Sequence, residues 1–199
     1  VGGDSVIGRC LGRYWKEQGV EFCASTRRIG AVSRERPYID LDQGIWSSIQ
    51  QTSYKSVVFC AAITSLANCE NNQHLSYRVN VRNTLKLAEI LSENVEYLLF
   101  LSTSQVFDGS RLPRKISEPL NPSSEYGRQK AEVEVGLRSF PNIGILRLGK
   151  VIHDEWPLLE VWRNRLLAGE IIEAYSDVIF SPVKVEDVVL KIDQVVRAQ

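Results

Sequence analysis

The feature that most constrains the fold of this chain is a repeated alternation of short apolar runs with longer segments of helical periodicity. Runs at residues 56–62 (SVVFCAA) and 97–102 (YLLFLS) have the length and apolar character of buried strands, and residues 142–148 (NIGILRL) predict a further strand. The segments between them place apolar side chains at intervals of three and four residues, which is typical of helices. Strands that alternate with helices predict βαβ units and therefore a mainly parallel sheet.

The remaining pattern outlines one α/β domain with a short C-terminal extension. Residues 108–124 are rich in Pro, Gly and Ser and predict a loop. We expect a doubly wound parallel sheet over residues 1–150, followed by a small lobe over residues 151–199 that is not an independent domain. The expected helices cover residues 7–18, 74–92, 124–139, 158–168 and 185–196, and less regular strands cover residues 1–3, 20–25, 36–41 and a stretch near Ile171.

Composition argues against several classes of partner. The 24 basic and 24 acidic residues cancel, so no basic surface for nucleic acid is expected. No apolar run approaches the length of a membrane span, and the start does not resemble a signal peptide, so a cytoplasmic location is expected. The four cysteines, at positions 10, 23, 60 and 69, lack C-x-x-C spacing. We expect them to pack as small apolar side chains, and we expect no metal site.

A glycine-rich turn at residues 2–8 (GGDSVIG) lies between a strand end and a helix. That context suits a dinucleotide, because glycines let backbone N–H groups approach a pyrophosphate at a helix N-terminus. The spacing is G-x-x-S-x-x-G, with Ser5 at a position usually held by Gly. An ordinary turn between a strand and a helix is the alternative. The candidate cofactor contacts are Gly2, Ser5, Val6, Ile7 and Gly8.

The end of the second expected strand bears on the choice of cofactor. An NAD site has an acidic residue there for the ribose 2′-OH, whereas an NADP site has cations for the 2′-phosphate. This chain has Arg27 and Arg28 at that place, and a guanidinium donates paired hydrogen bonds to a phosphate. NADP is therefore favoured, with NAD as the second choice. A solvated basic loop is the alternative.

Three further residues are candidates for carbonyl chemistry. Lys130 follows Tyr126 by four residues, so a helix would place both side chains on one face. Thr103 follows a buried strand and would lie at the carboxyl edge of the sheet, where ligands of such folds bind. The alternative is a Tyr126 that packs on the sheet beside a solvated Lys130.

These motifs resemble the extended short-chain dehydrogenase/reductase family, in its dTDP-4-dehydrorhamnose reductase-like branch, whose members act on nucleotide sugars. The resemblance lies in residues 60–70 (CAAITSLANCE), 101–109 (LSTSQVFDG), 121–134 (NPSSEYGRQKAEVE) and 181–188 (SPVKVEDV). It implies a Rossmann-type fold, an enzyme, and Thr103, Tyr126 and Lys130 as catalytic residues. It further implies that Asp40 and Leu41 lie beside the adenine and that Ala61 and Ala62 line the path of the cofactor.

The resemblance predicts an NADP-dependent reductase of a nucleotide-linked keto-sugar. Tyr126 would donate the proton, Thr103 would bind the developing oxyanion, and Lys130 would lower the pKa of Tyr126. Ser104 and Gln105 depart from the family pattern after the Thr, and the acidic residues of dehydratases are absent. A nucleotide-sugar epimerase and a non-catalytic NADP-binding regulator are the alternatives.

Two features concern the substrate and the assembly. The aromatic side chains of His153, Trp156 and Trp162 either line a sugar site or pack in the core. Arg147, at the end of the last main strand, faces either the pocket or solvent. The resemblance also allows a homodimer that forms through a pair of long helices covering the sheet.

Overall fold

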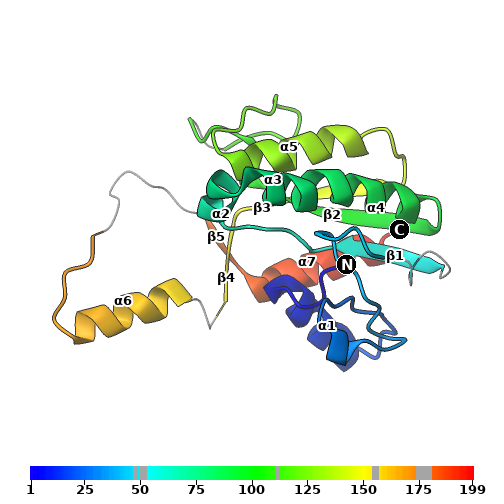
Figure 1. The fold of residues 1–199 in the computed structure, drawn as a ribbon, viewed down its shortest axis with the longest axis horizontal. Helices are drawn as coiled ribbons and strands as arrows, with labels where there is room; N and C mark the ends of the chain where they lie inside the picture. Colours follow the sequence, from blue (N-terminus) through cyan, green and yellow to red (C-terminus); the bar gives the residue numbers. More distant parts are fainter. Residues whose placement is uncertain (47–48, 50–52, 111–112, 154–156, 174–180) are drawn as a thin grey trace.

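Three parallel strands form the centre of the molecule, and helices cover both faces of the sheet (Figure 1). The structure, a computed structural model, describes residues 1–46, 49, 53–110, 113–153, 157–173 and 181–199. The strands β1 (Tyr54–Phe59), β2 (Val95–Thr103) and β3 (Ile143–Leu148) lie in the order β1-β2-β3. The three strands predicted from apolar runs are therefore confirmed, within a few residues of the expected bounds, and the residues of β3 are half-buried.

The helices occupy most of the chain between and after these strands. The longer ones are α1 (Val6–Glu17), α4 (Asn83–Ser92), α5 (Glu125–Leu137), α6 (Pro157–Leu167) and α7 (Val185–Arg197). The shorter ones are η1 (Ile29–Ala31), α2 (Leu66–Asn71), α3 (Gln73–Tyr77), η3 (Arg78–Arg82) and η4 (Ser104–Val106). A separate parallel pair is formed by β4 (Lys150–Ile152) and β5 (Pro182–Lys184).

Alternating side chains of β2 build two apolar layers, one on each face of the sheet. Leu98 and Phe100 are fully buried against α4 and α5, while Leu99 and Leu101 are buried against α1 and α7. Successive side chains of a strand point to opposite faces, so an unbroken apolar run is what a strand covered on both sides requires. The central part of the fold is thus doubly wound, as expected.

Serine side chains fix where two of the functional helices begin. The Ser5 hydroxyl accepts a hydrogen bond from Gly8 N, and the Ser124 hydroxyl accepts one from Gly127 N. Each satisfies one of the backbone N–H groups that a helix start leaves free. These caps place the glycine turn before α1 and Tyr126 in the first turn of α5.

The helix expected over residues 74–92 is present but contains a π-helical segment. The run begins as α3, widens at η3 and continues as α4. Asn80 lies in η3, where its side chain is turned into the protein and buried. Single π-helical turns are frequent at functional sites because they reorient side chains within a helix.

The prediction of a strand over residues 20–25 is wrong. This segment makes an isolated bridge from Thr26 to Tyr38 and a hydrogen bond from Gly3 N to Ser25 O, but no ladder. This segment and β1 both line an apolar hollow of about 350 Å³. Of residues 1–3, Val1 pairs with β1 through bonds to Val58 and Cys60. Residues 24–26 accept and donate hydrogen bonds along residues 35–39, but Pro37 has no backbone N–H to donate, so the pairing stays an isolated bridge.

The outer parts of the chain deviate from the predicted pattern in smaller ways. Residues 36–41 contribute only isolated bridges, and no strand forms at Ile171. The short strands β4 and β5 were not predicted. In Figure 1, α6 lies apart from the sheet, whereas α7 returns to pack against α1. Within the described ranges, no helix has both the length and the apolar content to span a membrane.

Candidate functional site

The glycine turn packs tightly against the end of β1. Gly2 has a positive φ of 84°, and a Cβ there would lie 2.6 Å from Ala61 N. A Cβ on Gly8 would collide with the Gly2 carbonyl oxygen, so both positions require glycine. Within the part of the chain that the structure describes, the N–H groups of Val6 and Ile7 have no hydrogen-bond acceptor. Free N–H groups at a helix start suit an anion such as a pyrophosphate.

The basic loop lies beside this turn, and an acidic residue lies between them. Arg27 and Arg28 are exposed. The Thr26 hydroxyl donates to Asp4 Oδ2 at 2.6 Å, and Arg36 Nη2 donates to Asp4 Oδ1 at 2.7 Å. Partial burial raises the pKa of the Asp4 carboxyl, but the Thr26 hydrogen bond and the cations Arg36 and Arg28 outweigh it and hold that pKa below its usual value. Asp4 is therefore ionised at neutral pH.

The residues predicted to lie beside the adenine form a tight turn. Asp40 accepts a hydrogen bond from Asp42 N at 2.8 Å, which closes the turn. Leu41 is buried in the apolar layer that includes α4 and α5, and its carbonyl accepts from the Asn83 side chain. The side chain of Leu41 thus packs in the core, so a contact with an adenine would come from its backbone.

Ala61 and Ala62 follow β1 at its carboxyl end and are half-buried. Asn80 holds the backbone of Ile63, the residue that follows Ala62. The Asn80 side chain accepts from Ile63 N at 2.7 Å and donates to Ile63 O at 2.9 Å. The close approach of Gly2 to Ala61 brings this segment against the glycine turn. The structure therefore brings two of the predicted cofactor segments together.

Tyr126 and Lys130 lie on the buried face of α5, with exposed fractions of 8% and 3%. Lys130 Nζ donates to the Leu101 carbonyl at 2.8 Å and lies 4.3 Å from the centre of the Phe100 ring. Burial lowers the pKa of Lys130 to about 8 and raises the pKa of Tyr126 to about 12. The direction for Tyr126 is opposite to the expected lowering, because burial is the main influence on the phenol. A protonated phenol is the form that donates a proton.

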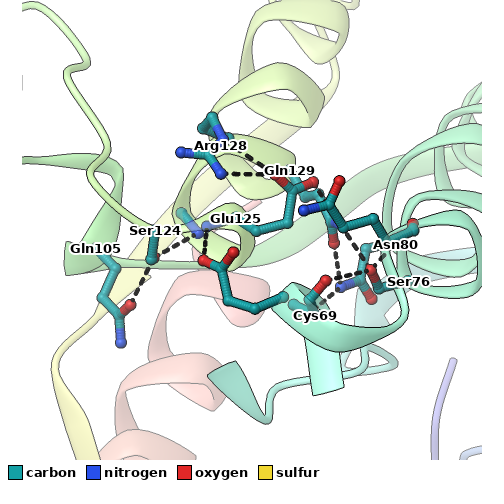
Figure 2. Close-up of polar contacts among 11 residues, drawn as sticks. Cys69, Ser76, Asn80, Gln105, Ser124, Glu125, Arg128 and Gln129 are labelled. Atoms are coloured by element: carbon teal, nitrogen blue, oxygen red, sulfur yellow. Dashed lines mark hydrogen bonds and ion pairs between the residues drawn. The ribbon is translucent and has the colours of Figure 1, made fainter. Parts of the chain in front are cut away.

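Thr103 ends β2 and is buried, and its hydroxyl accepts from Gln105 N at 3.2 Å. The segment after it contacts the start of α5, where Ser124 Oγ bonds to Gln105 Oε1 at 3.1 Å (Figure 2). Gly127 allows this approach, because a Cβ there would collide with the Gln105 carbonyl oxygen. The strand end with Thr103 and the helix turn with Tyr126 are thus held side by side.

Sequence reasoning missed a buried network centred on Gln129 (Figure 2). The Gln129 side chain is 1% exposed, and its Nε2 donates to Ser76 Oγ at 2.8 Å and to Glu125 Oε1 at 2.9 Å. Asn80 Nδ2 donates to Gln129 Oε1 at 2.8 Å. The network joins α5 to α3 and η3. A Gln three positions after Tyr126 on a half-buried helix was the available signal.

A second missed feature is a buried ion pair one helical turn beyond Lys130. Glu134 is fully buried, and Arg147 on β3 donates to both of its carboxylate oxygens. Ser102, the neighbour of Thr103, donates to Glu134 Oε1 at 2.6 Å. Arg147 is half-buried and directed at Glu134, an ion pair that the sequence did not predict. The signal was the i, i+4 spacing of Lys130 and Glu134 on one face.

Other candidate features lie away from these residues. A hollow of about 670 Å³ beside Glu125 is lined by side chains of α3 and η3, and neither Thr103, Tyr126 nor Lys130 lines it. All four cysteines are free, and the described residues contain no group of three or more His, Cys, Asp or Glu side chains able to hold a metal ion. His153 and Trp162 are half-buried, whereas Trp156 lies outside the described residues.

The family described as RmlD substrate binding domain matches this chain over residues 1–199. The chain belongs to the RmlD substrate binding domain family. The resemblance to dTDP-4-dehydrorhamnose reductases and their short-chain dehydrogenase/reductase relatives is thereby confirmed.

Curated relatives of this RmlD-family chain are distant reductases. A probable low-salt glycan biosynthesis reductase of Haloferax volcanii is 25% identical over 200 residues, which are 92% of this chain and 64% of that protein. The dTDP-4-dehydrorhamnose reductase of Sinorhizobium fredii is 34% identical over 116 residues, which are 56% of this chain and 39% of that enzyme. The chain thus spans less than two thirds of the length of these relatives.

Solved structures support the fold of this RmlD-family chain. A hypothetical dTDP-4-dehydrorhamnose reductase from Sulfolobus tokodaii has a TM-score of 0.82 at 19% identity, covering 99% of this chain and 71% of that one. The likeness confirms the Rossmann-type α/β fold with a parallel sheet. Other structures that share this fold contain bound NAD. The division at residue 150 and the substrate lobe stay predictions.

Proposed function

We propose that this chain binds NADP and carries the catalytic residues of a reductase that acts on a nucleotide-linked keto-sugar. The observation that carries the proposal is the placement of Tyr126 and Lys130, both buried on one face of α5 and packed beside the strand end at Thr103. A phenol, an ammonium and a hydroxyl at a carboxyl sheet edge are suited to proton transfer at a carbonyl. Membership of the RmlD family supports this choice.

The cofactor would lie along the glycine turn and the carboxyl ends of β1 and β2. The free N–H groups at the start of α1 and the glycines that a Cβ would block fit a pyrophosphate. The proposed contacts are Gly2, Ser5, Val6, Ile7 and Gly8 for the pyrophosphate, Arg27 and Arg28 for the 2′-phosphate, Asp40 and Leu41 for the adenine, Ala61 and Ala62 along the path, and Tyr126 and Lys130 at the nicotinamide ribose. When bound, the nicotinamide group supplies the hydride.

Side chains of this protein would donate the proton to the carbonyl oxygen and stabilise the negative charge that develops on it. Tyr126 donates its phenolic proton to that oxygen, a role that suits a phenol kept protonated by burial. The Thr103 hydroxyl donates a hydrogen bond to the developing oxyanion. Lys130, which now bonds to the Leu101 carbonyl, supplies the positive charge that favours phenolate once the proton has left.

The proposal separates the chain into a cofactor-binding part, residues 1–150, and a substrate-facing part, residues 151–199. The chain spans only part of the length of its curated relatives. That it forms a substrate pocket is therefore also part of what we propose. A nucleotide-linked keto-sugar matches the name of the Sinorhizobium fredii relative, a dTDP-4-dehydrorhamnose reductase. His153 and Trp162 are the described aromatic side chains that we assign to the substrate-facing part.

The test is a turnover assay on a panel of nucleotide-linked 4-keto-sugars, with NADPH oxidation followed by absorbance. We expect wild-type turnover and a loss of about 10²–10⁴-fold in Tyr126→Phe, because the general acid is removed. Tyr77→Phe is the matched control, since Tyr77 is exposed and its hydroxyl donates to the exposed side chain of Glu132. Interconversion of sugars without NADPH consumption would identify the epimerase instead. NADPH binding with no turnover in any form would favour the non-catalytic regulator.

A further inference from the structure

Asp4 places a carboxylate beside the loop that carries Arg27 and Arg28. Its side chain lies in the glycine turn, yet Oδ2 accepts from the Thr26 hydroxyl at 2.6 Å. Thr26 directly precedes Arg27 and stands at the end of the segment that corresponds to the second strand of the fold. In sites that select NAD, an acidic residue at this strand end binds the ribose 2′-OH. Here the acid comes from the turn instead.

Asp4 offsets part of the positive charge of the arginines around it. Arg36 Nη2 forms an ion pair with Asp4 Oδ1 at 2.7 Å, and the Arg28 guanidinium and the Arg27 backbone N–H also act on the carboxylate. Three arginines would otherwise give the loop a strong positive potential. Asp4 forms an ion pair with Arg36 and lowers the positive potential around Arg27 and Arg28. It does so because its carboxylate is ionised and only partly screened by water.

We propose that Asp4 determines the selectivity of this cofactor site, and that it opposes the preference for a 2′-phosphate set by Arg27 and Arg28. The inference rests on the proposed function, since it assumes a nicotinamide dinucleotide in the glycine turn. A 2′-phosphate adds negative charge that the Asp4 carboxylate repels, whereas a ribose 2′-OH can donate to that carboxylate. The wild-type site therefore accepts both NADH and NADPH, with only a modest preference between them.

The experiment measures dissociation constants of NADH and NADPH by fluorescence titration of the purified chain, which requires no sugar substrate. Asp4→Asn retains the shape and an acceptor for Thr26 but removes the charge and releases Arg36. We expect the ratio of NADPH affinity to NADH affinity to rise by about tenfold or more. Arg36→Gln leaves Asp4 without its ion-pair partner, so the ratio should fall.

Glu96→Gln is the matched control, because it removes an acid at the amino end of β2, at the opposite sheet edge from Thr103. Its ratio should equal that of the wild type. An unchanged ratio in Asp4→Asn, with both cofactors still bound, overturns the role of Asp4 but leaves the proposed function intact. Failure of the wild-type chain to bind either cofactor overturns both. Circular dichroism of each variant establishes that it is folded.

Discussion

Arg147 on β3 forms an ion pair with Glu134 on α5, with 2.6 Å between Nη2 and Oε2, and the Glu134 side chain is 1% exposed. The same carboxylate accepts from Ser102, the residue before Thr103. One buried charge thus connects the helix of Tyr126 and Lys130 to two strands of the sheet. Such a pair stabilises a particular arrangement of elements more than it stabilises the folded state as a whole.

Breaking this pair on one side should be far more harmful than removing it. Arg147→Leu leaves the buried Glu134 carboxylate without its ion-pair partner, and we expect the free energy of unfolding to fall by about 3–5 kcal/mol. The double variant Glu134→Leu with Arg147→Leu should recover most of that loss. Urea denaturation measures both. Arg163→Leu, whose partner Glu160 is also exposed, is the control and should change the stability by about 0–1 kcal/mol. A double variant as unstable as the single one would contradict this account.

The buried Lys130 makes stability depend on pH in a defined window. Its pKa is lowered from 10.5 to about 8 by burial, so between these values the unfolded chain holds a proton that the folded chain has lost. Stability therefore rises with pH across this window, by up to about 3 kcal/mol. The quantity to measure is the difference in unfolding free energy between wild type and Lys130→Met from pH 7.5 to 9.5. A difference that does not change with pH would rule out the shift.

Gly127 controls the contact between α5 and the segment after Thr103. A Cβ at this position would collide with the Gln105 carbonyl oxygen, a backbone atom that cannot rotate away. Gly127→Ala should lower the free energy of unfolding by about 1–3 kcal/mol and should also reduce turnover. Thermal unfolding and the NADPH assay measure these effects. Gly30→Ala is the control, because a Cβ on Gly30 meets nothing within 4 Å. Equal stability of the two variants would speak against the close contact.

Asn80 holds the backbone after β1 and the centre of the Gln129 network at once. Asn80→Ala leaves the Ile63 N–H and C=O groups and Gln129 Oε1 without this partner. We expect a loss of about 2 kcal/mol or more in the free energy of unfolding, together with weaker NADPH binding. Chemical denaturation and fluorescence titration measure the two effects. Asn68→Ala, at an exposed position on α2, should alter neither. Unaltered binding in a destabilised Asn80→Ala would limit its role to folding.

The sequence predicted the elements whose signal is local. The buried strands were readable because a strand covered on both faces is apolar throughout, and α1 was readable because its apolar side chains recur on one face. The segment at residues 20–25 has the composition of a strand, but a ladder also requires a partner that donates, and the partner segment contains Pro37. Three-residue strands such as β4 are too short to produce a pattern.

The candidate site divides in the same way. The elements that carry Thr103, Tyr126 and Lys130 were predicted, while the roles of these residues stay predictions. Asp4 and Glu134 were missed because their partners, Arg36 and Arg147, come from other segments. An acidic side chain in a turn or on a helix gives no sign of which distant cation it meets. Only the fold supplies that information.

The register of the central sheet has a consequence for how the protein is made. Tyr54 pairs with Val95, and Leu98 pairs with Ile143, so each pairing joins residues more than forty positions apart. Such long loops must close before the pairing stabilises them, which slows folding. On the ribosome, the strand end at Thr103 is synthesised before α5, and Arg147 emerges only after both. The nascent chain therefore cannot form the ion pair between Arg147 and Glu134 until β3 has left the exit tunnel.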